Sequence, residues 1–136
     1  MPYLLDTNVF AALSQPRPSR RVDRAFARHA AELVTASIVV HEMWFGIERM
    51  PRSRRRAELE AFMSDVVGAI RVLPYGARAA RWDASERARL EAIGRPPRMA
   101  DAQIASIARV HDATLVTANV ADFQMFEGLR LESWMA

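Results

Sequence analysis

The feature of this sequence that most constrains its fold is the alternation of short apolar runs with longer segments of helical periodicity. The runs at residues 3–5, 33–36, 70–73 and 114–117 predict buried strands, and residues 129–131 predict a fifth. The segments between them predict helices at residues 9–13, 19–29, 37–50, 53–67, 77–93 and 99–110. Strands that alternate with helices favour an α/β fold, with a mainly parallel sheet of four to five strands that helices cover on both faces.

Capping residues mark several ends of these helices. Ser19 and Ser37 are expected to cap the second and third helices, because a serine hydroxyl can accept a bond from a free backbone N–H. Pro51 is expected to stop the third helix. Gly94 stands where a glycine in the left-handed conformation often ends a helix.

The length and composition indicate one soluble domain over residues 1–136. Hydrophobic residues make up 51% and charged residues 26% of the chain, which is typical of a globular protein. No apolar stretch reaches the ~18 residues that span a bilayer, and the first residues lack the basic region of a secretory signal. Without cysteine the chain has no disulfides or thiolate metal ligands, which fits a reducing cytoplasm, and no membrane contact is expected.

All 19 basic residues are arginine, and the absence of lysine excludes whole classes of function. A Walker A phosphate loop needs a lysine, and so does an enzyme that forms a Schiff base. Arginine suits phosphate recognition through its bidentate geometry, but a net charge of +3 is too small to establish nucleic-acid binding by itself.

Polar residues stand at the ends of three expected strands. Asp6, Thr7 and Asn8 follow the first strand, Ser37 follows the second, and Thr117 to Asn119 end the fourth. In open α/β sheets, ligands bind outside the carboxyl ends of the strands. The sequence therefore places a functional site at this edge.

Four acids could meet at that edge, although each one alone has an ordinary structural explanation. Asp6, Asp101 and Asp122 could each cap or begin a helix, and Glu42 could be a solvated helical residue. Two carboxylates ~4 Å apart repel by about 4 kcal/mol at an effective dielectric of 20, so a cluster must protonate, separate or hold a cation. With no cysteine and only three histidines, Mg²⁺ or Mn²⁺ is favoured over zinc.

Competing catalytic motifs do not fit. His41-Glu42 begins like a zinc-protease helix, but Phe45 occupies the position of the second histidine. The sequence contains neither a Gly-x-Gly-x-x-Gly nor a Gly-x-Ser-x-Gly pattern. His41 is interpreted as a surface residue.

Several segments, in order along the whole chain, resemble the motifs of PIN-domain nucleases, and most closely the VapC-type toxins of bacterial toxin–antitoxin pairs. The matching segments are Leu5-Asp6-Thr7-Asn8, the Ser-x-x-x-x-Glu-x-x-x-Gly stretch from Ser37 to Gly46, the helical segment 79–94, residues 101–108 around Asp101, Leu115 to Asn119, and Asp122-Phe123.

The resemblance implies a three-layer α/β/α fold and an endoribonuclease that depends on Mg²⁺ or Mn²⁺. It also implies a homodimer and a cognate, VapB-like antitoxin that blocks the site. The chain would then contact DNA only indirectly, through this antitoxin. The alternative is a non-catalytic partner-binding module that acts only in a DNA-bound complex with its antitoxin. A nuclease that processes DNA flaps is disfavoured, because the chain is too short for the extra arch of such enzymes.

Carried over residue by residue, the resemblance makes Asp6, Glu42 and Asp101 the metal-binding acids. Thr7, Asn8 and Thr117 would position an acid, a water or the substrate, and so would Asn119. Many relatives have an acid where this chain has Asn119. Either Asp122 supplies the fourth carboxylate or a second metal is weakly held.

Two further surface candidates come from the residues themselves. The cluster of Arg52, Arg54, Arg55 and Arg56 could hold flanking phosphates, although a solvated helix end is the simpler interpretation. Trp44 and Phe45 could form a dimer face or an antitoxin groove, or could instead pack in the core.

Overall fold

The computed structural model describes residues 1–135, and these contain a five-stranded sheet in the order β3-β2-β1-β4-β5. All four strand pairs are parallel. The strands are β1 (Tyr3–Leu5), β2 (Leu33–Ala36), β3 (Arg71–Leu73), β4 (Thr114–Val116) and β5 (Leu131–Glu132). The N-terminal strand β1 is central, between β2 and β4, and the expected parallel α/β sheet is confirmed.

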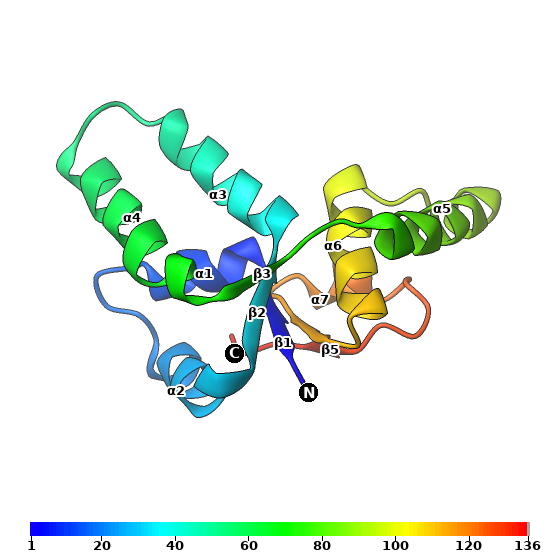
Figure 1. The fold of residues 1–136 in the computed structure, drawn as a ribbon, viewed down its shortest axis with the longest axis horizontal. Coiled ribbons are helices and arrows are strands. Elements are labelled where there is room, and N and C mark those ends of the chain that lie inside the picture. Colours follow the sequence, from blue (N-terminus) through cyan, green and yellow to red (C-terminus); the bar gives the residue numbers. More distant parts are fainter. Residues whose placement is uncertain (136) are drawn as a thin grey trace.

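Helices lie on both sides of this sheet, as Figure 1 shows, so the fold has three layers. In that view α1 to α4 lie to the left of the sheet, and α5 and α6 to its right. The helices are α1 (Thr7–Leu13), α2 (Arg20–Arg28), α3 (Ser37–Glu48), α4 (Arg54–Asp65), α5 (Ala77–Ala92), α6 (Met99–Val110) and α7 (Val120–Phe123), with short 3-10 turns η1 (Ala30–Glu32) and η2 (Val67–Ala69).

Most of the expected caps are present. The Ser19 side chain accepts from the backbone N–H of Val22 and caps α2. Gly94 has a φ of 74° and follows α5, and Arg95 donates its backbone N–H to the Leu90 carbonyl, which closes a Schellman motif. The prediction for Ser37 is wrong, because Ala36 is the N-cap and Ser37 is the first residue of α3. The helix begins directly at the end of β2, with no intervening residue.

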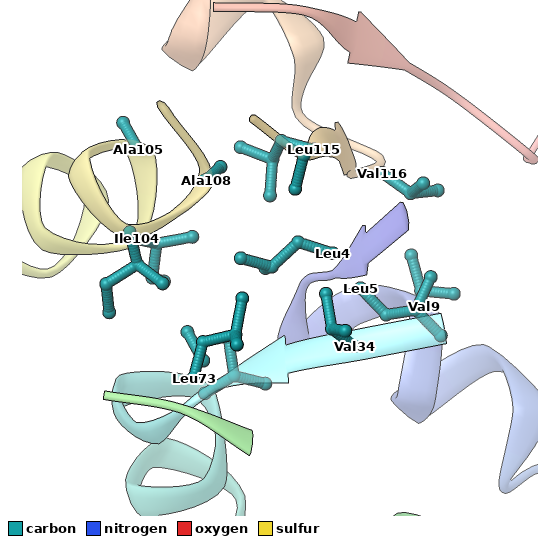
Figure 2. Packing of buried hydrophobic residues seen from close by; sticks show 14 of the residues in the cluster. Leu4, Leu5, Val9, Val34, Leu73, Ile104, Ala105, Ala108, Leu115 and Val116 are labelled. Atoms are coloured by element: carbon teal, nitrogen blue, oxygen red, sulfur yellow. The ribbon is translucent and has the colours of Figure 1, made fainter. Parts of the chain in front are cut away.

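The core lies on both faces of β1 and β4, whose residues Leu4, Leu5, Leu115 and Val116 have no exposed surface. Successive side chains of a strand point to opposite faces. In Figure 2 Leu4 accordingly points toward α6, whereas Leu5 points toward Val9 of α1. Both faces are covered, so these strands are continuously apolar rather than alternating.

The fifth strand begins two residues later than the sequence predicts. The backbone N–H of Leu115 binds the Arg130 carbonyl at 2.9 Å, and that of Thr117 binds the Glu132 carbonyl at 3.1 Å. Pairing with β4, rather than local hydrophobicity, therefore determines where β5 lies. None of the helices within residues 1–135 is long and apolar enough to cross a bilayer.

Candidate active site

Asp6 is the last residue before α1 and lies at the carboxyl end of the central strand. Its backbone N–H binds the Val116 carbonyl at 3.0 Å, which fixes it between β1 and β4. The side chain is 6% exposed and accepts three hydrogen bonds: from the Thr7 backbone N–H at 2.7 Å, the Thr117 hydroxyl at 2.9 Å and the Asn8 amide at 3.3 Å. Burial raises the pKa of Asp6 above its ordinary value, although these hydrogen bonds lower it.

Asn8 and Thr117 connect the ends of β1 and β4 across 109 residues of sequence. The Asn8 carbonyl oxygen accepts the Ala118 backbone N–H at 2.8 Å, and the Asn8 amide donates to the Thr117 hydroxyl at 3.4 Å. The Thr117 hydroxyl also accepts the Asn119 backbone N–H at 3.1 Å. Both side chains therefore hold the Asp6 carboxylate in place.

Glu42 reaches the same edge from α3. Its Oε1 accepts the Thr7 hydroxyl at 3.0 Å, and the carboxylate is half-buried. Thr7 thus joins two of the expected acids, donating its backbone N–H to Asp6 and its hydroxyl to Glu42. The other carboxylate oxygen of Glu42 is not part of this bond.

Asp101 lies in the first turn of α6, where Arg98, not Asp101, is the N-cap residue. The carboxylate is half-buried. Burial raises its pKa, the charge of Arg98 lowers it, and the charges of Asp6, Asp122 and Glu42 raise it further. The charges of the other three acids therefore all reach Asp101, which places the four side chains at the same edge of the sheet.

The fourth acid near the site is Asp122, in the first turn of the short helix α7. It is exposed, and its charge acts on Asp101. Asn119 is the N-cap residue of α7 but makes no side-chain capping bond, and its backbone N–H binds Thr117. Asp122 is thus the side chain that brings a fourth negative charge to this edge.

The chemistry of these side chains suits a hard cation, although they are not drawn together around one point. Four carboxylates with only oxygen donors are the ligands that Mg²⁺ and Mn²⁺ prefer. Within residues 1–135, no three His, Asp or Glu side chains lie close enough to form a metal site as they stand.

Arg98 is a residue near the site that the sequence analysis missed. It lies three residues before Asp101, is exposed, and acts on the Asp101 carboxylate through its charge. The sequence offered one signal that could have identified Arg98: it stands immediately before the helix that carries Asp101, and that helix begins at the carboxyl edge of the sheet. A guanidinium at this position can bind a phosphate that approaches the acids.

An apolar pocket opens beside Thr7 and Glu42, between α1, α3 and α4. Its volume is about 270 Å³. Its walls include the apolar side chains Met43, Ile47, Met50, Leu59, Phe62 and Met63. Trp44 and Phe45 are not among the lining residues and are 36% and 53% exposed, so the interpretation that they pack in the core is wrong. Phe45 lies on the side of α3 that faces away from the buried Val39 and Ile47.

The four-arginine cluster divides into two pairs. Arg55 donates to the Ser14 carbonyl at 3.2 Å and Arg56 to the Met50 carbonyl at 2.8 Å, so these two brace the chain around α4. Arg52 and Arg54 are exposed.

Comparison with known proteins adds the family. Residues 3–125 match the model of the PIN domain. The chain is 34% identical, over 134 residues and 97% of each chain, to the tRNA(fMet)-specific endonuclease VapC of Shigella flexneri. It is 29% identical, over 133 residues and 98% of each chain, to Ribonuclease VapC2 of Haemophilus influenzae.

Solved structures agree with these sequence matches. The DNA-bound VapBC of Salmonella typhimurium contains a chain with a TM-score of 0.87 and 26% identity, over 98% of each chain. VapBC2 of Rickettsia felis, bound to a DNA fragment from its promoter, gives a TM-score of 0.84 and 26% identity, over 98% of this chain and 99% of that one.

Proposed function

We infer the function of this chain from the family to which it belongs, the PIN-domain family and within it the VapC ribonucleases of toxin–antitoxin systems. The proposal is an endoribonuclease toxin that hydrolyses phosphodiester bonds in RNA and depends on Mg²⁺ or Mn²⁺. The observation that carries the proposal is that Thr7 joins the Asp6 and Glu42 carboxylates at the carboxyl edge of the sheet, where the charges of both also raise the pKa of Asp101.

Each acid has a distinct place in the proposed mechanism. Asp6 and Asp101 would hold the cation, because both are at least half-buried and Asp6 is fixed by three hydrogen bonds. A bound Mg²⁺ supplies Lewis-acid polarisation of the phosphate and a water of lowered pKa. Glu42 is oriented by the Thr7 hydroxyl at one oxygen and accepts the proton of the attacking water at the other. Attack by water leaves a 5′-phosphate and a 3′-hydroxyl.

The proposed regulator is a VapB-like antitoxin. The chain's structural neighbours include complexes named VapBC. The apolar pocket between α1, α3 and α4 includes Thr7 and Glu42 in its walls, so a protein segment bound there would cover the site. A homodimer is also proposed, from the family resemblance. DNA contact is proposed only through the antitoxin.

The non-catalytic alternative is not favoured. The relatives at 34% and 29% identity are named as an endonuclease and a ribonuclease. Asp6 does cap α1, since its side chain accepts the Thr7 backbone N–H, but a capping role does not account for Glu42, which lies inside α3.

The test is cleavage of a panel of purified RNAs by the isolated chain. We expect cleavage with Mg²⁺ or Mn²⁺, none with a chelator, and loss in Asp6→Asn. Asp23→Asn, which changes an exposed acid on α2, is the matched control and should cleave like the wild type. Undiminished cleavage in the chelator or in Asp6→Asn would contradict the proposal.

A further inference from the structure

Three planar side chains form a continuous stack on the exposed side of α3. His41, Phe45 and Arg49 are four residues apart, so they occupy successive turns of the same helix face. The rings of His41 and Phe45 have centroids 6.1 Å apart and planes within 4° of parallel. The Arg49 guanidinium carbon lies 4.6 Å from the centre of the Phe45 ring. We call these three residues the α3 stack.

The α3 stack does not contribute to the core. Phe45 is 53% exposed, and His41 and Arg49 are exposed as well. The core side of α3 is formed by Val39 and Ile47, which are buried. A preorganised aromatic and guanidinium surface is therefore left on the outside of the molecule.

The position of the α3 stack connects it to Glu42. At about 100° per residue, Arg49 falls within about 20° of Glu42 around the helix axis, and Phe45 within about 60°. At a rise of 1.5 Å per residue, Phe45 lies about 4.5 Å and Arg49 about 10 Å along the axis from Glu42. The α3 stack thus begins beside the candidate active site and extends away from it along the helix axis. Its extent is comparable to the length of one to two nucleotides of an RNA strand.

The charges around the α3 stack favour a polyanion. Two acids flank it on α3: Glu42, which belongs to the candidate active site, and Glu48, which lies 3.5 Å from Arg56, whose charge offsets it. Beyond Arg49 the chain continues with the exposed Arg52 and Arg54. In a twofold contact between two copies of the chain this positive surface would meet itself, which like-charge repulsion opposes.

We propose that the α3 stack binds unpaired bases of the RNA substrate next to the scissile phosphodiester, with Arg49 on a neighbouring phosphate. This inference rests on the proposed ribonuclease function. Aromatic rings stack on any base, because every base has a π face, but a base must be unpaired to reach them. A cation–π contact on an exposed ring is weaker than stacking of a base on it. A base can therefore replace the guanidinium over Phe45, which releases Arg49 to reach a phosphate.

The test measures RNA binding separately from cleavage. The affinity of the full chain for a fluorescently labelled, unstructured RNA of about ten nucleotides is followed by anisotropy in the presence of a chelator. Phe45→Ala should raise Kd at least about fivefold, whereas Phe45→Tyr, which keeps an aromatic ring, should retain wild-type affinity. Arg49→Ala should reduce the slope of log K against log salt by about 0.7, the contribution of one phosphate contact on a single strand.

The matched control is Ile93→Ala, which removes a large apolar side chain, 58% exposed, after the end of α5. It should bind RNA like the wild type. Wild-type affinity in Phe45→Ala, with cleavage intact in the unchanged chain, overturns this inference and leaves the ribonuclease proposal standing. If Phe45→Ala changes the oligomeric state in gel filtration but keeps the wild-type RNA affinity, the α3 stack contacts a second copy of the chain instead, and the inference is overturned. A wild-type chain that neither binds nor cleaves RNA overturns both.

Discussion

Thr117→Val tests how strongly the site depends on one buried hydroxyl. The Thr117 side chain has no exposed surface. Its single O–H donates to the Asp6 carboxylate, and its oxygen accepts from the Asn8 amide and the Asn119 backbone N–H. One donor and two acceptor positions are all that a hydroxyl offers, so every one is used. Valine has nearly the same shape but can make none of these bonds.

The magnitude follows from the bond to the carboxylate. A hydrogen bond to a charged group contributes about 1.5–3 kcal/mol, and the loss leaves a buried acceptor without its partner. We take about 2 kcal/mol as the expected loss in the free energy of unfolding. An unfolding entropy of about 2.1 cal/mol/K per residue over this chain gives roughly 0.29 kcal/mol/K. The expected fall in Tm is therefore about 7 °C.

The assay is thermal unfolding at neutral pH in a chelator, with Thr117→Ser as the control. Serine keeps the hydroxyl and loses only a methyl group, so its Tm should lie clearly above that of Thr117→Val. The same substitution in an Asp6→Asn background should cost about 1 kcal/mol less, because the acceptor is no longer charged. The reasoning would be refuted if the valine and serine variants had the same Tm. It would also be refuted if Thr117→Val lowered the free energy of unfolding equally in the wild type and in Asp6→Asn.

Three further predictions follow from other contacts. Asp101→Asn should raise Tm while abolishing RNA cleavage, because burial and three neighbouring acids raise the pKa of Asp101 and its charge therefore opposes folding at neutral pH; a lower Tm would show that the carboxylate stabilises the fold. Burial and the bond to Asp83 raise the pKa of Tyr75 to about 12, so unfolding titrations should show stability falling between about pH 10 and pH 12, and Tyr75→Phe should remove that fall. Gly128→Ala should lower Tm by several degrees, because Gly128 has a φ of 73° and its added Cβ would lie 2.9 Å from Arg109 Nε; an unchanged Tm would show that the loop adapts without cost.

The location of the candidate site could be predicted from the sequence because the carboxyl ends of all strands in a parallel sheet lie at the same edge. Asp6 follows, and Thr117 ends, an apolar run that predicts a buried strand, and the carboxyl ends of those strands meet at one edge. The bonds between the polar residues could not be predicted. Thr7 could as well have capped α1, and only the packing of α3 against α1 brings its hydroxyl to Glu42.

Three features that the sequence analysis missed or left open have a common physical origin, since each concerns a residue whose environment comes from distant parts of the chain. The limits of β5 depend on its pairing with β4 and not on the hydrophobicity of Leu129. Phe45 has the composition of a core residue, but the rotation of α3 about its axis turns it outward. Arg98 carries no motif, and its relation to Asp101 depends on the direction in which α6 begins.

The central place of the N-terminal strand bears on when the enzyme can become active during its own synthesis. β1 is made first but pairs on one side with β4, and Asp6 is held by Thr117, which is added after most of the chain. At translation rates of about 5–20 residues per second, roughly 5–20 s separate the synthesis of these partners. Until then Asp6 lacks both its neighbouring strand and its hydroxyl donor. A ribonuclease built in this order has no assembled catalytic edge while its chain is still being extended on the ribosome.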